Sequence, residues 1–355
     1  MSYLNTPQIF DKTLPCISSS TEETKNTLLK IRNTNRHVLL GAQRLMGSPN
    51  EPELMEIQLG GRKPAVVGYE RQNGQAKIRD FIKSDYEAGS IITLLDHTPN
   101  PLSYDGWTTY NPEIGSSPEV NGSKDISQGS NALSACLPGG AQRDRWLSYL
   151  DGLAAFLNTL TDGNGEKIPV VLRPLHEQMG NWYWWHQYST KAQLVSLWQD
   201  YVDRLRFNNV SNVLICWCTT VNNVGGTTFT YADYNPLYPG DNYCDMVGVD
   251  LYSEQPGGSL RHGWLRNGYL ANVQIAGEHN KPLTIPEMGF SNSAQSWSAT
   301  TEDFWSEVIL PDLKSNFVGA RWLQFWNDKW GPCQLDSPNS PGAVKMFKDS
   351  YWKTV

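Results

Sequence analysis

The sequence has no cluster of positive charge. Its 355 residues include 29 Lys and Arg against 36 Asp and Glu, which gives a formal net charge of −7, and no basic run is longer than a pair. A polyanion would be repelled by this balance. The composition therefore excludes nucleic acid as a partner and leaves neutral ligands.

Long apolar runs are also missing. No uninterrupted apolar stretch reaches the roughly 20 residues of a transmembrane helix, and the start, MSYLNTPQIF, lacks the apolar core of a signal peptide. We therefore expect no association with a membrane. The chain is interpreted as a mature form that begins with an added Met1.

Cysteine is too sparse for a disulfide scaffold. The six cysteines show no CxxC spacing. Cys216 and Cys218 lie two residues apart on one expected strand and cannot bridge each other without strain. One or two bridges among Cys16, Cys136 and Cys333 are compatible with the sequence, which does not determine their connectivity.

Several common catalytic motifs are absent. The chain contains no P-loop, GxGxxG or GxSxG pattern, which argues against nucleotide binding and against the serine of an α/β-hydrolase. His176 and Glu177 begin like the zinc motif HExxH, but the second histidine is missing. We expect neither a metal nor a cofactor.

What the chain does contain is a series of eight short runs rich in Val, Ile and Leu. Near-continuous apolar runs are typical of parallel strands that are covered on both faces. Eight of them in a chain of this length predict a single (β/α)₈ TIM barrel over residues 1–355. The runs are 38–43, 65–70, 91–97, 170–177, 213–218, 246–252, 282–289 and 321–328.

The stretches between these runs have helical spacing. Apolar residues recur every three or four positions from Trp146 to Leu160 and from Leu194 to Leu205. Ser340 before Pro341 has the pattern of an N-cap followed by proline at the first helical position. This pattern predicts a last helix that extends through Phe347.

Polar residues gather where the runs end, which in a (β/α)₈ barrel is the catalytic face. The segment 98–140 starts there after the third run and is too long for an ordinary connection. We interpret it as a wall or lid of a cleft that carries Trp107 and Tyr110. The residues at the ends of the runs are Gln43, Glu70, His97, Glu177, Tyr252, Glu287 and Trp326.

Two of these residues are glutamates. Glu177 ends VVLRPLHE and Glu287 lies in PLTIPEMG, and three tryptophans follow Glu177 within eight residues, at 182, 184 and 185. Burial of a carboxylate is costly, so a pair of them requires a function. Hydrolysis of a glycosidic bond uses two carboxyl groups across the bond and flat apolar surfaces for the sugar rings. The pair therefore predicts a glycosidase.

Arg173 is expected beside this pair. The two-residue period of a strand places Arg173 and Leu175 on the face of Glu177, and Ile285 on the face of Glu287. A guanidinium there would keep a nucleophilic carboxylate ionised. The alternative is that Arg173 and the two glutamates form a buried ion network that only fixes the barrel.

The segment 173–185, R-P-L-H-E-x-x-G-x-W-Y-W-W, resembles the acid/base motif of glycoside hydrolase family 26, best known for β-mannanases. The sequence departs from the family pattern at Glu70, where an aspartate is expected, and at Gln178 and Met179. The similarity covers residues 38–330 and includes His97, LPGG at 137–140, VGVDLY at 247–252, IPEMG at 285–289 and FW at 325–326.

The resemblance implies a retaining enzyme in which Glu177 is the acid/base and Glu287 is the nucleophile. It also implies that Tyr252 orients the nucleophile through its hydroxyl, and that Trp182 and Trp326 are platforms around the cleaved bond. The substrate-binding residues that we expect are His97, His176, Trp182, Tyr252, Trp326, Arg173 and Trp107.

The predicted function is that of a secreted, monomeric endo-β-1,4-mannanase of hemicellulose degradation. Its partner would be mannan, glucomannan or galactomannan, which are too large to enter a cell, and this size is the reason to expect secretion. The alternatives are a β-glucanase or β-1,3-xylanase with the same two glutamates, or a non-catalytic carbohydrate-binding barrel. The presence of both glutamates argues against the last alternative.

Overall fold

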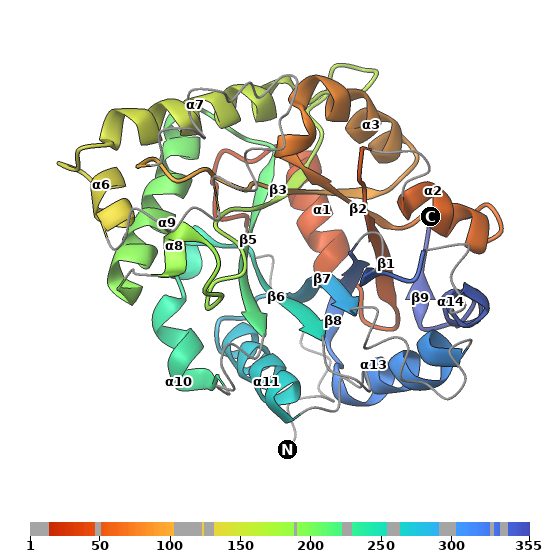
Figure 1. The fold of residues 1–355 in the computed structure, drawn as a ribbon. Helices are drawn as coiled ribbons and strands as arrows, with labels where there is room; N and C mark the ends of the chain where they lie inside the picture. Colours follow the sequence, from red (N-terminus) through yellow and green to blue (C-terminus); the bar gives the residue numbers. More distant parts are fainter. Residues whose placement is uncertain are drawn as a thin grey trace.

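Eight parallel strands form a closed barrel. The computed structural model describes residues 14–46, 51–102, 123, 131–187, 190–221, 229–253, 263–290, 303–326, 330–333 and 340–355. Within these ranges the strands follow one another around the ring, and β1 pairs with both β2 and β8 (Figure 1). The predicted (β/α)₈ barrel is confirmed. The strands are β1 Val38–Gln43, β2 Val66–Glu70, β3 Ile91–Leu95, β4 Val170–Arg173, β5 Val213–Val221, β6 Met246–Ser253, β7 Leu283–Phe290 and β8 Ala320–Phe325.

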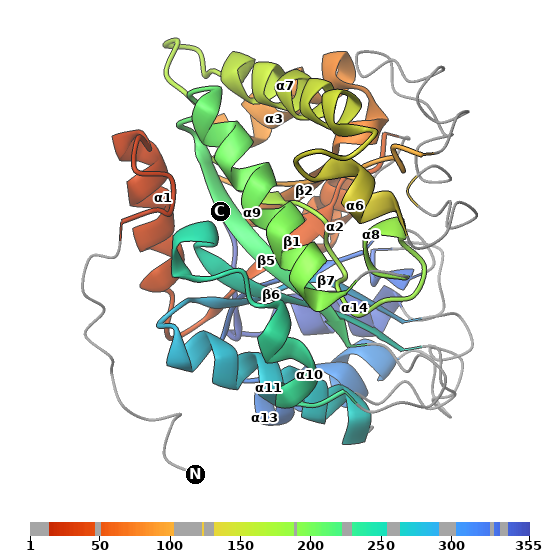
Figure 2. The ribbon, with the colours of Figure 1, turned by 90° about the vertical axis from the view of Figure 1, so that its left-hand side faces the viewer.

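Helices surround the ring of strands (Figures 1 and 2). The apolar positions predicted from Trp146 to Leu160 and from Leu194 to Leu205 are buried, and Thr190 closes a capping box with Gln193. The longer helices after the strands are α2 Glu51–Gln58, α3 Gln75–Glu87, α7 Arg143–Thr159, α9 Lys191–Phe207, α11 Gly263–Glu278, α13 Leu310–Asn316 and α14 Ser340–Phe347. Shorter elements are α6 Ala132–Cys136, α8 Trp184–Gln187, α10 Tyr231–Tyr234, η1 Arg71–Asn73, η4 Asn235–Leu237, η5 Asp241–Tyr243 and the π-helix η7 Phe304–Ile309.

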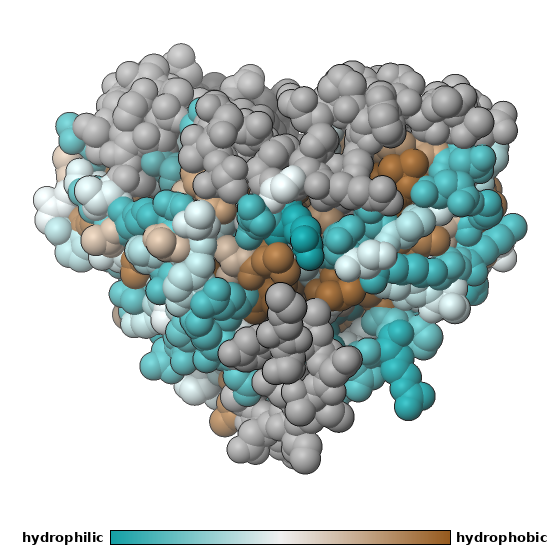
Figure 3. Space-filling view, turned by 90° about the horizontal axis from the view of Figure 1, so that it is seen from below, coloured by the Kyte–Doolittle hydropathy of each residue, from teal (hydrophilic) through white to brown (hydrophobic). Residues whose placement is uncertain are grey.

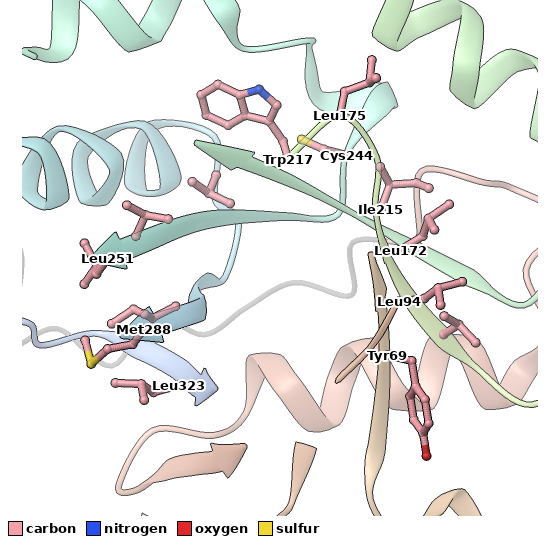
Figure 4. Close-up of a cluster of buried hydrophobic side chains, with 14 of the residues drawn as sticks. Tyr69, Leu94, Leu172, Leu175, Ile215, Trp217, Cys244, Leu251, Met288 and Leu323 are labelled. Atoms are coloured by element: carbon pink, nitrogen blue, oxygen red, sulfur yellow. The ribbon is translucent and has the colours of Figure 1, made fainter. Parts of the chain in front are cut away.

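The largest core lies between the strands and the surrounding helices. It consists of the side chains that alternate toward the outside of the barrel, together with the apolar faces of helices such as α7, α9 and α11. Figure 4 shows part of this layer. Its members there include Tyr69, Leu94, Leu172, Ile215, Trp217, Leu251, Met288 and Leu323, which come from β2 to β8.

A second, smaller core fills the barrel interior at the amino ends of the strands, which we call the lower end. Leu28 and Ile31 of α1 (Glu22–Arg32) pack against it. Figure 2 shows α1 on one side of the barrel and α8 on the other. The short strand β9 (Trp352–Lys353) adds to β1 near the same end, because Val38 pairs with Trp352. The strand residues of this core are Leu39, Ala65, Val66, Ile91, Val171, Leu214, Cys216, Cys218, Met246 and Trp322.

All six cysteines are free thiols, so the bridges considered among Cys16, Cys136 and Cys333 are not formed. Among the described residues, no helix combines the length and apolarity required to cross a bilayer. Much of the coloured surface in Figure 3 is hydrophilic. The large apolar side chains that are exposed in the described ranges come from separate elements and are Leu14, Ile57, Phe81, Phe207, Leu270 and Val355.

Candidate active site

Glu177 is positioned by a turn that follows β4. The strand ends at Arg173, four residues before the glutamate, so the prediction that the run continues to Glu177 is wrong. Leu175, Glu177 and Met179 all have positive φ, at 41°, 52° and 80°. Such backbone is strained for non-glycine residues and is concentrated at functional sites. Leu175 therefore packs in the outer core instead of sharing a face with Glu177.

This turn is anchored on β5. The backbone N–H of Gln178 donates to the Cys218 carbonyl at 3.2 Å, and the Thr220 N–H donates to the Gln178 carbonyl at 2.9 Å. The Gln178 side chain accepts a hydrogen bond from Trp217 Nε1 at 2.9 Å. These hydrogen bonds of Gln178 hold the adjacent Glu177 in place and compensate for its strained backbone.

Trp182 contacts the Glu177 carboxylate directly. Its Nε1 donates to Oε2 of Glu177 at 2.6 Å. Gly180 makes this approach possible, because a Cβ at position 180 would lie 2.6 Å from the Trp182 ring. The spacing E-x-x-G-x-W is therefore a requirement of geometry. Trp182 is partly exposed, so it also offers apolar surface next to the carboxylate.

Glu287 reaches the barrel interior through a bulge in β7. Gly248 of β6 pairs with Thr284 of β7, and Leu251 pairs with Met288. The two pairs are three residues apart on β6 but four apart on β7, so β7 contains one extra residue. An extra residue of this kind reverses the alternation of side chains. Ile285 consequently lies in the outer core, and the prediction that it shares a face with Glu287 is wrong. The bulge includes Pro286, which has no N–H to contribute to a ladder.

Arg173 forms ion pairs with two carboxylates. Its Nη1 lies 2.8 Å from Oε1 of Glu287, and its Nη2 lies 2.8 Å from Oδ2 of Asp250. All three side chains are buried. Burial raises the pKa of the Asp250 carboxyl, Arg173 lowers it, and Glu287 and Glu177 raise it further, with a net shift upward. The predicted contact of Arg173 with Glu287 is present, and its second partner is Asp250.

The two glutamates face each other across a short gap. One carboxylate oxygen from each of Glu177, Asp250 and Glu287 lies within 4.8 Å of the other two. Three carboxylates so close are an arrangement that also suits a divalent cation. Here the Arg173 guanidinium lies against two of them and offsets part of their negative charge.

Tyr252 and Trp326 complete the surroundings of Glu287. The Tyr252 hydroxyl donates to Oε2 of Glu287 at 2.7 Å. Gly289 leaves room for this tyrosine, because a Cβ there would lie 2.7 Å from the ring. Trp326 follows β8, is partly exposed, and donates its backbone N–H to the Met288 carbonyl at 2.8 Å. It is therefore held beside the strand of the nucleophile candidate.

His97 and His176 lie together on the Glu177 side. Their ring centroids are 4.9 Å apart in an edge-to-face arrangement, and both rings are buried. His97 follows β3 by two residues, so this strand also ends earlier than predicted. Trp107 and Tyr110 lie outside the described residues, as does most of the segment 98–140.

Sequence reasoning missed two residues of the site, Asp250 and Tyr183. Asp250 lies two residues before Tyr252 on β6, and the two-residue period already placed it on the same face. Tyr183 was visible only as one aromatic residue in a cluster of them. Its hydroxyl lies 2.9 Å from Nε2 of His97, a contact that no local pattern indicates.

The chain is similar to several known proteins. It is 26% identical to a mannan endo-1,4-beta-mannosidase of Bifidobacterium adolescentis over 75% of this chain and 25% of that protein. It is 32% identical to endoglucanase H of Acetivibrio thermocellus over 51% of this chain and 20% of that protein. The chain therefore spans a quarter or less of the length of these two relatives.

The fold is shared with a solved structure of a GH26 beta-mannanase from Bacteroides ovatus. The TM-score is 0.78 at 22% sequence identity, over 95% of this chain and 96% of the other. The family model described as "Glycosyl hydrolase family 26" matches residues 20–276, which include the whole acid/base segment and β6. With a match over well more than half of its length, the chain belongs to glycosyl hydrolase family 26.

Proposed function

We propose that the protein is a retaining endo-β-1,4-mannanase that hydrolyses mannan, glucomannan or galactomannan. The observation that carries this proposal is the close approach of Glu177 and Glu287, whose nearest oxygens lie within 4.8 Å. Retaining glycosidases have carboxyl groups about 5–5.5 Å apart, whereas inverting enzymes leave about 6.5–9.5 Å for a water molecule. The similarity to mannan endo-1,4-beta-mannosidases supports the choice of substrate.

The contacts support different roles for the two carboxylates. Glu287 is bound by Arg173 at one oxygen and by Tyr252 at the other, so its charge is balanced and its orientation is fixed for attack on the anomeric carbon. As the bond to the departing sugar breaks, Glu177 gives its proton to the leaving oxygen. Glu177 then takes a proton from water, whose oxygen displaces Glu287 and regenerates both carboxyl groups.

The test measures reducing ends released from locust bean gum and the anomeric configuration of the first product. We expect the wild-type protein to release β-configured products and Glu287→Gln to release almost none. Glu166→Gln is the matched control, because Glu166 is exposed in the connection between α7 and β4. Products of α configuration would contradict retention, and full activity of Glu287→Gln would contradict its role.

A β-glucanase is the second candidate function, because the chain is 32% identical to a stretch of endoglucanase H. Hydrolysis of mannohexaose, laminarin and lichenan side by side separates the two candidates. Faster release from lichenan than from mannohexaose would favour the glucanase. Binding to all three without any release would favour a non-catalytic carbohydrate-binding barrel.

Secretion and a monomeric state are further parts of the proposal. A polysaccharide is too large to enter a cell, so the enzyme that cleaves it has to act outside. Activity retained inside washed host cells would contradict secretion. Light scattering that gives twice the 39.9 kDa mass of the chain would contradict the monomer.

A further inference from the structure

The hydroxyl of Tyr183 lies between the two histidines of the site. It is 2.9 Å from Nε2 of His97 and 3.4 Å from Nε2 of His176. The three rings pack closely, with centroid distances of 5.6 Å from Tyr183 to His97 and 5.1 Å from Tyr183 to His176. One phenolic oxygen therefore contacts the same nitrogen of both imidazoles.

The phenol is held rigidly in this place. The Tyr183 ring is stacked on the buried ring of Trp185, with centroids 4.2 Å apart and an interplanar angle of 16°. Trp185 in turn donates its Nε1 proton to the backbone carbonyl of His176 at 3.0 Å. The stack thus ties the position of Tyr183 to the backbone that carries His176.

His97 is fixed from the other side through its neighbour Asp96. The buried Asp96 carboxylate accepts hydrogen bonds from the Tyr149 hydroxyl at 2.6 Å, from Thr98 Oγ1 at 3.0 Å and from Gln72 Nε2 at 3.2 Å. The backbone on both sides of His97 is therefore restrained, and the imidazole has little freedom to move away from Tyr183.

Tyr183 has only one proton to give. Burial, followed by the charges of Glu177, Glu287, Glu70 and Asp250, raises its pKa well above the usual value, so the phenol is neutral at neutral pH. A neutral phenol donates one hydrogen bond and accepts others. At most one of the two Nε2 atoms can therefore be an acceptor from Tyr183.

We propose that Tyr183 is a positioning residue that gives His97 and His176 opposite proton arrangements at Nε2. One imidazole accepts the phenolic proton and carries its own proton on Nδ1, while the other donates an Nε2 proton to the phenolic oxygen. The tautomer of a neutral histidine is set by such partners.

The consequence for catalysis rests on the proposed function. Two histidines with fixed and different tautomers present a fixed set of donors and acceptors beside Glu177, which selects the orientation of sugar hydroxyls. Tyr183→Phe removes the hydroxyl and keeps the stack on Trp185. Loss of such a hydrogen bond corresponds to a fall in kcat/KM of roughly tenfold.

The experiment is ¹⁵N–¹H correlation of histidine side chains in the full-length protein, with the two resonance sets assigned from His97→Gln and His176→Gln. We expect one ring with its proton on Nδ1 and the other with its proton on Nε2 in the wild type. Tyr183→Phe is expected to remove this difference. The control is Tyr269→Phe, because Tyr269 lies on α11, far from the histidines in sequence, and donates to the Val318 carbonyl at 2.9 Å.

Two results would overturn the proposal: the same tautomer for both rings in the wild type, or an unchanged spectrum in a folded Tyr183→Phe. Equal kcat/KM for Tyr183→Phe and Tyr269→Phe on mannan would also overturn the positioning role. The spectra need no turnover, so failure of the wild-type protein to hydrolyse any glycan would contradict the proposed function and leave the tautomer result standing.

Discussion

The two ends of the barrel interior are built in different ways. At the lower end, apolar strand residues such as Leu39 and Trp322 pack with one another and with α1. At the carboxyl end, which we call the upper end, the interior holds Arg173, Asp250 and Glu287, all buried and linked by ion pairs. Between them, Gln324 donates to Gln43 at 2.7 Å.

The difference separates residues that stabilise the fold from residues that serve chemistry. Burial of apolar area at the lower end contributes about 25 cal/mol per Å² to folding. Buried ion pairs at the upper end give little net stability, because desolvation of the charges offsets their attraction. The strained backbone of Leu175, Glu177 and Met179 lies at the upper end as well. We therefore expect substitutions at the two ends to affect different quantities.

The largest effect is expected for Glu287→Gln at the upper end. Removal of a nucleophile lowers kcat by about 10⁴-fold or more. The amide retains the shape of the side chain and an oxygen that can accept from Arg173, which also keeps its pair with Asp250, so the midpoint of urea unfolding should change little. Activity on locust bean gum and unfolding curves, measured on the same preparation, check both parts. If activity fell only in proportion to the fraction of folded protein, the proposed separation of catalytic from stabilising residues would be contradicted.

Asp250→Ala is expected to change both quantities. It breaks a buried ion pair and leaves the Arg173 guanidinium with Glu287 alone, which costs about 3–5 kcal/mol of stability. Activity should fall too, because Arg173 also positions Glu287. The control is Asp203→Ala, which removes an exposed pair with Arg206 and should cost no more than about 1 kcal/mol. Equal unfolding midpoints for the two variants would contradict this prediction.

Trp322→Ala tests the lower end. Removal of a fully buried tryptophan is expected to cost about 3–5 kcal/mol of stability. The kcat of the molecules that remain folded should be that of the wild type, because Trp322 belongs to the lower core and not to the site. Thermal unfolding and kinetics below the transition give the two numbers. A large fall in kcat of the folded fraction would show that the two ends are coupled.

Trp182→Phe is expected to have a smaller effect on catalysis. It removes the hydrogen bond to the Glu177 carboxylate and keeps an aromatic ring, and a bond to a charged group contributes about 1.5–3 kcal/mol, or roughly 10–100-fold in kcat/KM. The loss should shrink for aryl glycosides, whose leaving groups need little protonation. Trp198→Phe, which loses only a bond to the Tyr243 carbonyl, is the control. An equal loss on both kinds of substrate would argue against a role through Glu177.

The last effect is a dependence on pH that is absent at neutral pH and concerns a neutral thiol of the lower core. Burial raises the pKa of Cys216 to about 12, against about 8.5 in an unfolded chain. The unfolded state loses this proton first, so the stabilisation is present below about pH 8.5 and declines by about 1.4 kcal/mol per pH unit up to about pH 12. Urea unfolding of the wild type and Cys216→Ala between these limits measures the difference in slope. Parallel pH profiles would contradict the assignment.

The lower end and the outer core could be predicted from the sequence. All eight apolar runs overlap a strand of the barrel, although β5, β6, β7 and β8 extend beyond the predicted bounds, and β1 has the bounds that were predicted. The helical positions from Trp146 to Leu160 are buried as expected. These predictions succeed because apolar periodicity is a local property that the burial of side chains selects directly.

The upper end was predicted only in part. The approach of Glu177 and Glu287 follows from the chemistry of the pair, but the strand period that was used to align them does not apply. One residue lies in a turn with positive φ and the other on a bulge of β7. The strand period already placed Asp250 on the face of Tyr252, but its pair with Arg173 and the contact of Tyr183 with His97 join distant parts of the chain and depend on how the barrel closes.

The closure of the lower end by Leu28 and Ile31 of α1 has a kinetic consequence. Within the described part of the chain, this apolar core closes the lower side, which leaves the upper side as the route for solvent to the carboxylates. In the proposed double displacement, the water that releases the sugar from Glu287 enters through the same opening as the next oligosaccharide. Water and sugar hydroxyls therefore compete for one covalent intermediate, and concentrated oligosaccharide should divert part of it into longer chains by transglycosylation.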